Sequence, residues 1–479
     1  MEIEARSLAR FEALLPPERV LVFQEKAADA RRRLAGRIVW NINATAQGGG
    51  VAEMLQTLLA YARGAGVDTR WLVLGGTPAF FAVTKRIHNV LHGVPGDGGP
   101  LGEAERSLYQ QVLADNLATC IGEIRAGDIV LLHDPQTAGL AESLRHHGAR
   151  VVWRCHVGRD TANELTASGW AFLRPYLQAA EALIFSRASY IPGVAARERS
   201  WVIPPSIDPF TAKNIDMTDD VALHILIRSG LLSSRETPPA VSFTRRDGST
   251  GLCRQHRGLL GGAVPPPVDA RLIVQVSRWD RLKDMAGVLR GFVARLGILP
   301  ADVQLVLAGP DVSGVADDPE GADVFAECRA MWRALPEPVR TRVHLASLPM
   351  DDVDENAILV NALQRHAYAV VQKSLVEGFG LTVTEAMWKG RPVIASRIGG
   401  IQDQIVEGRD GLLLDEPSDL EAFGEALVRL VSDPALAARL GAAARQRVQS
   451  DFLGDRHLIQ YVDLFARLVT AENPAQSGP

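Results

Sequence analysis

Short apolar runs separated by amphipathic stretches dominate the first half of the chain. The runs lie at 37–42, 71–74, 129–132, 150–153 and 182–185. Between the first two, the apolar residues Val51, Met54, Leu55, Leu58 and Tyr61 recur at three- or four-residue intervals, which is the helical period. Buried strands that alternate with helices are typical of a parallel α/β sheet. The pattern therefore predicts such a sheet in this half.

A second series of strands begins after an interruption. From about 230 to 268 the periodicity fails, and Pro-containing stretches flank a polar, Gly-containing segment, which is typical of a linker or inserted loop. Apolar runs then return at 272–276, 303–307, 343–345, 369–371 and 392–395. The fold class we predict is α/β, with two Rossmann-like domains facing a cleft. The expected ranges are 1–210 for the first domain, 211–268 for the linker and inserted loop, 269–450 for the second domain, and 451–479 for a C-terminal helix and frayed tail.

Composition agrees with two globular domains. The chain has 479 residues, which is too long for one compact domain, and 47% of them are hydrophobic while 22% are charged. The net charge is −5 and no basic block stands out. We therefore expect no nucleic-acid partner.

Several features point to the cytoplasm. The first residues are acidic and no apolar signal region follows them, and no apolar stretch reaches the ~18–20 residues of a membrane span. The four cysteines are scattered without a CxxC spacing, as expected for reduced thiols. A cytoplasmic protein without a membrane partner is the expectation.

Polar residues end two strands of the first half. His133 and Asp134 follow the run at 129–132, and His156 follows the run at 150–153. The carboxyl ends of parallel strands form the binding crevice of open α/β sheets, so these side chains should gather at one rim. A single buried histidine is more often structural. A position at the carboxyl end of a strand favours a functional role, and it does so more strongly for His156 than for His133.

A charged constellation marks the second half. Arg278 and Lys283 follow the strand at 272–276, and Glu377 and Glu385 lie eight residues apart around a Gly-rich turn. The cations suit a diphosphate. The amides of Gly380, Leu381 and Thr382 can approach a phosphate at a helix N-terminus, which leaves the carboxylates for sugar hydroxyls. Only six of the 51 basic residues are Lys, so a Lys at this position is weak further support. The set predicts a nucleotide-sugar site.

Each of these features also has a structural explanation. Arg278 and Lys283 could be solvated loop charges. Thr382-Val-Thr-Glu385 fits a capping box, in which Glu385 would bond to the backbone of the helix start. Gly48-Gly49-Gly50 could be a simple turn, although its amides could also approach a donor phosphate. No metal-ligand cluster or nucleophile motif is visible, so we expect no metal cofactor.

At these residues the sequence resembles the retaining glycosyltransferases of the GT-B fold, in the family 4 that includes sucrose-phosphate synthases and trehalose synthases. The first half is similar to the trehalose glycosyltransferring synthases. The resemblance covers most of 37–470 and is carried by Ile42–Glu53, Phe80–Asn89, His133–Gln136, Trp153–His156, Pro204–Asp208 and Glu377–Gly390. Two features depart from the family: the long insertion at 230–268, and Val157-Gly158-Arg159-Asp160, where the family usually has Ile-Asp after the histidine.

The resemblance implies a reaction and a division of roles. The enzyme would transfer glucose from a nucleoside diphosphate glucose to free glucose, with retention, and make α,α-trehalose without a metal. Arg278 and Lys283 would neutralise the diphosphate, with help from the amides at Gly380–Thr382. Glu385 would hold the ribose and Glu377 the transferred glucose. His156, with Gly49 and Gly50, would orient the sugar. His133, Asp134 and Lys85 would bind the acceptor. The resemblance leaves a homodimer open.

Four other functions compete with this one. A trehalose phosphorylase, or another family-4 transferase with a different acceptor, would use the same cations. A non-catalytic sugar-nucleotide sensor would not explain why both carboxylates and both cations are present. An NAD-dependent oxidoreductase would need a GxGxxG motif, and none follows Asn41 or Val276.

Overall fold

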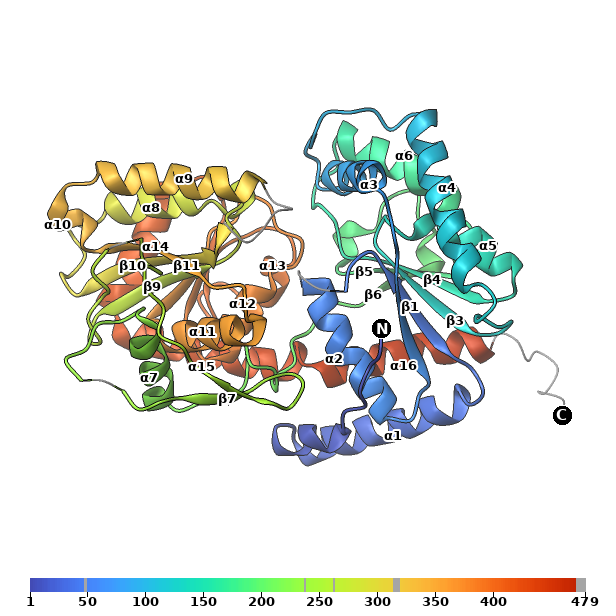
Figure 1. The fold of residues 1–479 in the computed structure, drawn as a ribbon, viewed down its shortest axis with the longest axis horizontal. Coiled ribbons are helices and arrows are strands. Elements are labelled where there is room, and N and C mark those ends of the chain that lie inside the picture. Colours follow the sequence, from blue (N-terminus) through green and yellow to red (C-terminus); the bar gives the residue numbers. More distant parts are fainter. Residues whose placement is uncertain (47–49, 237, 262, 313–318, 471–479) are drawn as a thin grey trace. The chain divides into compact units, whose positions relative to one another are not determined.

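The computed structural model describes residues 1–46, 50–236, 238–261, 263–312 and 319–470 (Figure 1). The chain divides into two compact units. Unit 1 is formed by Met1–Ser206 together with Phe452–Pro479, and unit 2 by Ile207–Asp451. The C-terminal helix therefore returns to the first unit. The tail that the sequence analysis expects to fray, 473–479, lies outside the described residues.

The main helices and strands of unit 1 are α1 (Pro17–Arg33), β1 (Val39–Asn43), α2 (Gly50–Gly64), β2 (Thr69–Val73), α3 (Pro78–Leu91), α4 (Glu103–Cys120), β3 (Ile129–His133), α5 (Ala141–His146), β4 (Arg150–Cys155), α6 (Glu164–Leu177), β5 (Ala182–Phe185), β6 (Ser200–Val202) and α16 (Gly454–Thr470). Its six strands are all parallel and pair in the order β2-β1-β3-β4-β5-β6.

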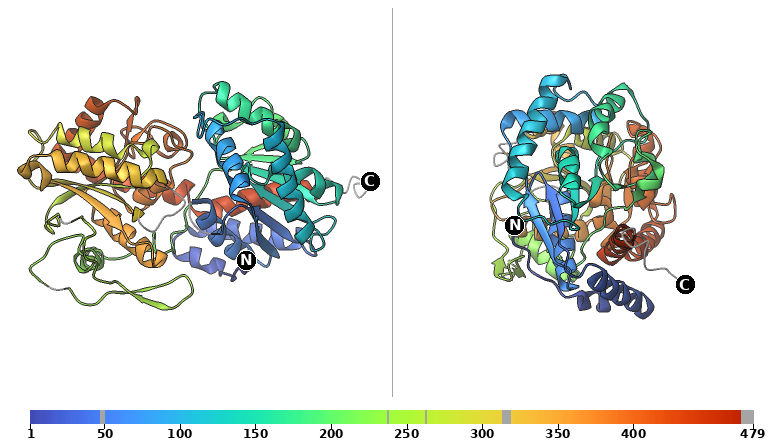
Figure 2. Two further views of the ribbon diagram at one scale, coloured as in Figure 1. Left: turned by 45° about the horizontal axis from the view of Figure 1, so that its top comes forward. Right: turned by 90° about the vertical axis from the view of Figure 1, so that its right-hand side faces the viewer.

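Alternate residues of β1 point to opposite faces of this sheet, as strand geometry requires. Trp40 and Ile42 lie in the core under α3, α4 and α6. Val39 lies in a second core, where Leu464 of α16 and Ala30 of α1 cover the other face. Figure 2 shows helices on both faces of the sheet. The near-continuous apolar strands follow from this double covering.

The elements of unit 2 are α7 (Asp219–Ser229), β7 (Ser242–Thr244), β8 (Thr250–Leu252), β9 (Arg271–Val276), the 3-10 helix η5 (Arg281–Lys283), α8 (Met285–Val293), β10 (Val303–Pro310), α9 (Pro319–Ala334), α10 (Glu337–Arg340), β11 (Val343–Leu348), α11 (Val353–His366), β12 (Ala369–Gln372), α12 (Leu381–Trp388), β13 (Val393–Ser396), α13 (Ile401–Gln404), β14 (Leu412–Leu414), α14 (Leu420–Ser432) and α15 (Pro434–Asp451). Its parallel sheet has the order β11-β10-β9-β12-β13-β14, which is the Rossmann order.

Strand order locates the candidate ligand sites. In each sheet, chain order runs outward in both directions from one pair of neighbours, β1 and β3 in unit 1 and β9 and β12 in unit 2. Ligands of open α/β sheets bind outside the carboxyl ends of the strands at this reversal. His133 ends β3, and the Lys283 and Glu377 loops follow β9 and β12. The fold therefore brings His133 of the first half, and Lys283 and Glu377 of the second, to the favoured rim of their own sheets.

The segment predicted as a linker and inserted loop is part of unit 2 and contains regular structure. It holds α7, which packs against α11, and the antiparallel hairpin β7–β8. The hairpin is attached through charge: Arg245 Nη2 lies 2.7 Å from Asp352 Oδ2, and Arg246 Nε lies 3.0 Å from Asp354 Oδ1. Since ion pairs rather than an apolar face hold it, hydrophobic periodicity could not predict it.

Candidate active site

Two histidines meet at the carboxyl end of the unit 1 sheet. His133 Nδ1 lies 3.2 Å from His156 Nε2, and the two ring planes are 17° apart with their centroids 5.5 Å apart. His133 Nε2 lies 3.0 Å from Asn41 Oδ1, across the β1–β3 reversal. His133 is fully buried and both of its ring nitrogens are occupied. His133 is therefore a buried neighbour of His156, and the acceptor contact expected from the sequence stays a prediction.

Asp134 holds the backbone of His156. Its Oδ1 accepts a hydrogen bond of 2.7 Å from the His156 amide. Asp134 has φ 64°, a conformation that non-glycine residues seldom adopt. Burial raises the pKa of its carboxyl to about 7, although the His156 amide and Arg154 act in the opposite direction. The predicted pair of Asp134 and His156 is therefore brought into direct contact.

A buried guanidinium lies on β4, two residues before His156. Arg154 is fully buried, and Nη1 lies 2.9 Å from His457 Nε2 of α16 and also donates to the Tyr461 hydroxyl. Burial, and then the charge of Arg154, lowers the pKa of His133 to about 3 and that of His156 well below its usual range. Both histidines are therefore neutral at physiological pH. The sequence analysis missed Arg154 because a polar residue near a strand end gives no sign of a partner 303 residues away.

Two other predicted residues of this half stand apart. Lys85 lies on the exposed surface of α3, whereas His133 ends β3 and His156 follows β4. Gly50 begins α2. Gly48 and Gly49 lie outside the described residues, so the predicted glycine loop is described only at its end.

Lys283 and Glu377 form the centre of the unit 2 site. Lys283 Nζ donates to Glu377 Oε2 at 2.7 Å, and their side chains are 17% and 12% exposed. The Ser374 hydroxyl also donates to Glu377 Oε2, at 3.2 Å. Asp280 caps the 3-10 turn that carries Lys283, since its Oδ1 accepts from the Leu282 amide at 2.8 Å. A cation and a carboxylate predicted from segments 94 residues apart are thus in contact.

The two loops that carry this pair are joined at further points. The Leu375 amide donates to the Leu282 carbonyl at 2.7 Å. Lys373, whose side chain is fully buried, forms an ion pair with Asp284, the residue that caps α8. The sequence analysis did not identify Lys373 or Asp284. The scarcity of lysine in the chain was the only signal for Lys373.

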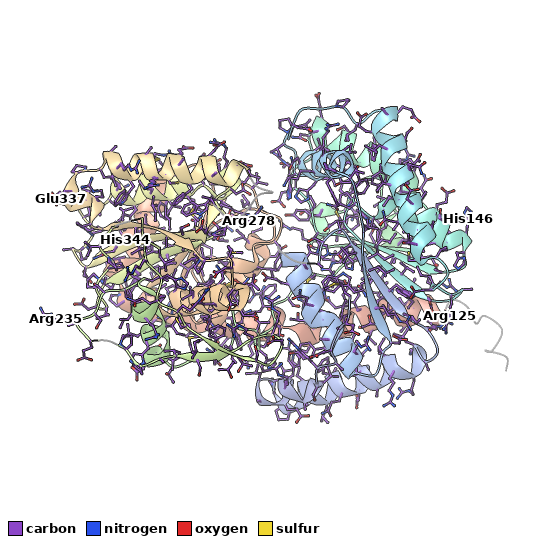
Figure 3. The ribbon with its side chains drawn as sticks, in the orientation of Figure 1. Arg125, His146, Arg235, Arg278, Glu337 and His344 are labelled. Carbon is purple, nitrogen blue, oxygen red and sulfur yellow. The ribbon has the colours of Figure 1, made fainter. Side chains whose placement is uncertain are left out.

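Arg278 forms an ion pair with Asp280 on its own loop. Its side chain is 59% exposed at the surface of unit 2, and Nη2 lies 3.2 Å from Asp280 Oδ2 (Figure 3). The predicted cationic pair of Arg278 and Lys283 is therefore one partly buried lysine and one exposed arginine.

Helix α12 begins as a phosphate site requires. Its N-cap is Gly380, with φ 83°, and the amides of Leu381 and Thr382 lie in its first turn. Because no side chain caps the helix, these amides can donate to a bound phosphate. The Thr382 hydroxyl donates instead to Gln372 Oε1 at 3.1 Å. The capping box is therefore wrong, because Glu385 lies in the second turn and cannot bond back to a Thr382 cap.

Glu385 is held in a buried charged cluster. Its side chain is 7% exposed, and Oε1 lies 3.8 Å from Lys213 Nζ. Lys213 is on a segment fixed to α11 and α12, because Asn361 Nδ2 donates to the Ala212 carbonyl at 2.9 Å and Trp388 Nε1 to the Asn214 carbonyl at 2.9 Å. The cluster orients a carboxylate one turn inside α12. Lys213 was not among the predicted site residues.

Lys389 lies behind this cluster and is itself buried. Its ammonium donates to Gln364 Oε1 at 2.8 Å and to Asn214 Oδ1 at 3.2 Å. Burial lowers the pKa of Lys389 to about 7, while the charge of Glu385 opposes this shift.

A pH-dependent stability follows from Lys389. The unfolded chain binds its proton up to pH ~10.4 and the folded protein only up to about pH 7, so the free energy of unfolding should rise with pH across this window. One proton contributes at most ~1.4 kcal/mol per pH unit. Urea titrations at pH 7, 8.5 and 9.5 should show this rise in the wild type relative to Lys389→Met. A constant difference between the two proteins would contradict the lowered pKa.

The described residues lack two kinds of feature. They contain no group of three or more His, Cys, Asp or Glu side chains placed to hold a metal ion. No helix in the described part of the chain is long and apolar enough to cross a membrane.

Comparison with known families gives two matches, one in each half. Residues 41–192 match the family model described as "Trehalose synthase, N-terminal domain", and residues 351–447 match "Glycosyl transferases group 1". The first range contains the histidine cluster, and the second contains Glu377 and Glu385.

Full-length relatives have the same description. The chain is 33% identical to a trehalose synthase of Pyrococcus horikoshii, over 97% of each chain. It is 34% identical to a trehalose synthase of Rubrobacter xylanophilus, again over 97% of each chain. A trehalose phosphorylase of Pleurotus sajor-caju is 26% identical, over 89% of this chain and 57% of the phosphorylase.

Solved structures confirm the fold. A sucrose-phosphate synthase of Thermosynechococcus elongatus aligns with a TM-score of 0.63 at 18% identity, over 91% of this chain and 100% of that chain. An α,α-trehalose 6-phosphate synthase of Burkholderia multivorans aligns with a TM-score of 0.65 at 15% identity, over 92% and 100%. The predicted fold class of two Rossmann-like domains, GT-B, is confirmed.

Proposed function

Because the chain belongs to the trehalose synthase family of GT-B glycosyltransferases, we propose that it transfers glucose from a nucleoside diphosphate glucose to free glucose and makes α,α-trehalose with retention. The observation that carries this proposal is the full-length match to relatives named trehalose synthase, which covers both sheets and the residues at the ends of their strands. The trehalose phosphorylase resembles this chain less closely.

The donor would bind at the carboxyl end of the unit 2 sheet. Lys283 would neutralise the diphosphate, where negative charge grows as the leaving group departs. The first amides of α12 would add hydrogen bonds to the same phosphates. Lys283 lies 2.7 Å from Glu377, so the phosphate end and the transferred glucose would be held by adjacent groups. The partly buried Lys283 is better placed for this role than the exposed Arg278.

The carboxylates would bind the two sugars of the donor. Glu385, beside Lys213, would accept hydrogen bonds from the ribose hydroxyls, and Glu377 would accept them from the transferred glucose. In unit 1, His156 and Asp134 would take part in binding the acceptor glucose. A metal ion is not needed in this scheme, because Lys283 and the α12 amides supply the positive charge.

A donor and acceptor screen tests the proposal. The protein is incubated with glucose and UDP-, ADP- or GDP-glucose, with a chelator and without phosphate, and the product is identified by NMR. We expect α,α-trehalose from at least one nucleotide donor. Parallel reactions replace the donor by glucose 1-phosphate or the acceptor by glucose 6-phosphate. Product from glucose 1-phosphate alone would identify a phosphorylase, while trehalose 6-phosphate or a strict requirement for Mg²⁺ would contradict the proposal.

A further inference from the structure

His156 is held at two separate points in unit 1. Asp134 Oδ1 accepts from its amide at 2.7 Å, which fixes the main chain. Its ring Nε2 lies 3.2 Å from His133 Nδ1, which fixes the side chain. His133 in turn contacts Asn41, and both residues are buried, with exposed fractions of 0% and 2%. Three residues from three neighbouring strands thus form one hydrogen-bonded row, Asn41–His133–His156.

The donor and acceptor properties of these groups determine which atom donates in each hydrogen bond of the row. The Asn41 atom that faces His133 is Oδ1, which can only accept, so His133 Nε2 must carry a proton and donate. Burial and the charge of Arg154 keep His133 neutral, so its Nδ1 has no proton and accepts. His156 Nε2 must then donate to it. Since His156 is neutral as well, its Nδ1 is left without a proton.

We propose that Asn41 and His133 are positioning residues that hold His156 in its Nε2–H tautomer, so that Nδ1 accepts a hydrogen bond from a sugar hydroxyl at the reacting centre. The identity of the sugar depends on the glucosyl transfer proposed above. The row itself depends only on contacts within unit 1. It also explains why a fully buried histidine lies at the end of β3: His133 transmits the polarity of the Asn41 amide to a partly exposed neighbour.

The tautomers can be measured directly. Long-range ¹H–¹⁵N correlation spectra of ¹⁵N-histidine-labelled protein distinguish the two neutral forms of each ring. Single His→Gln variants at His133 and His156 assign the signals. We expect both residues in the Nε2–H form in the wild type at pH 7. An Nδ1–H form or an imidazolium at His156 would overturn the proposal, whether or not the protein makes trehalose.

Asn41→Leu tests whether the Asn41 oxygen sets the donor-to-acceptor direction of the hydrogen bonds in this row. Without the acceptor oxygen, buried His133 has a hydrogen-bond partner only at Nδ1, so it should move its proton there and donate to His156 Nε2. Both tautomers should therefore switch, and His156 Nδ1 should become a donor. Thr69→Val is the matched control: its hydroxyl lies 3.5 Å from Asn41 Nδ2, but it does not contact His133 through any described interaction. Unchanged spectra in folded Asn41→Leu would contradict the assignment.

The activity of the same variants tests the use of Nδ1. Asn41→Leu should lower kcat/KM for the acceptor roughly 10- to 100-fold, the scale for loss of a group that orients a functional histidine. Affinity for the nucleoside diphosphate, whose proposed site is in unit 2, should not change, and Thr69→Val should retain wild-type activity. Normal transfer by a variant whose tautomers have switched would overturn the functional half of the proposal. A wild type that makes no trehalose, yet has the expected tautomers, would refute the proposed function and leave the row intact.

Discussion

Lys283→Ala is expected to lower kcat/KM for trehalose formation by roughly 10²–10³, the scale for loss of one preorganised electrostatic stabiliser. The physical reason is that Lys283 is a partly buried cation in η5, which follows β9, and its Nζ lies 2.7 Å from Glu377 Oε2. Its removal takes positive charge away from the proposed diphosphate position and leaves Glu377 without its lysine partner. Steady-state kinetics with the preferred nucleotide donor measure the effect.

The same 3-10 turn provides a matched control. Arg281 is 61% exposed and pairs with Glu327 at 3.2 Å, so Arg281→Ala removes a cation two residues away from Lys283 without reaching Glu377. Its activity should stay near that of the wild type, because its ion-pair partner is Glu327 and not Glu377. Its stability should also change little, since exposed ion pairs contribute ~0–1 kcal/mol to folding. Thermal unfolding of both variants shows whether a loss of activity comes from the missing charge or from unfolding of the protein. Near-normal turnover of folded Lys283→Ala would remove this residue from the site.

Most of the sheet strands were predictable because both sheets are covered on two faces. Such strands are continuous apolar runs, and all ten predicted runs overlap with observed strands. The sequence analysis missed β6 and β14, which have three residues each, and the β7–β8 hairpin. A three-residue run such as Leu412–Leu414 is too short to show a period. In the hairpin, Arg245 and Arg246 make the tertiary contacts, so the apolar pattern contains no signal for it.

The sequence was enough to predict which residues lie near the ends of strands. It was not enough to predict which of these residues contact one another. Lys283 and Glu377 were both named from sequence, and strand order brings them together. The partners Asn41, Arg154 and Lys213 depend on which strands and helices become neighbours, and local periodicity does not specify this. Burial also distinguishes candidate residues in a way that residue type could not. His133 is fully buried, whereas Arg278 lies at the surface. A homodimer, a cytoplasmic location and independence from metal stay predictions.

The two glutamates should differ in the step that they affect. Glu385→Gln should weaken binding of a nucleoside diphosphate roughly 10- to 100-fold, because a charged acceptor for the ribose hydroxyls is lost beside Lys213. Glu377→Gln should leave this binding near the wild-type value and lower kcat instead, because its proposed partner is the transferred glucose, which a nucleoside diphosphate lacks. Calorimetric titration with UDP, ADP and GDP, together with steady-state kinetics, measures both effects.

The structure sharpens the interpretation of this pair of variants. With Gly380 as the N-cap of α12, Glu385 does not cap the helix, so a loss of affinity in Glu385→Gln cannot be attributed to a missing cap. Glu327→Gln is a suitable control, since Glu327 is 43% exposed and its ion-pair partner is the exposed Arg281. It should match the wild type in both assays. If Glu377→Gln and Glu385→Gln gave the same nucleotide affinity and the same kcat, the carboxylates would not divide the donor between them, and the assignment of ribose to Glu385 and glucose to Glu377 would be wrong.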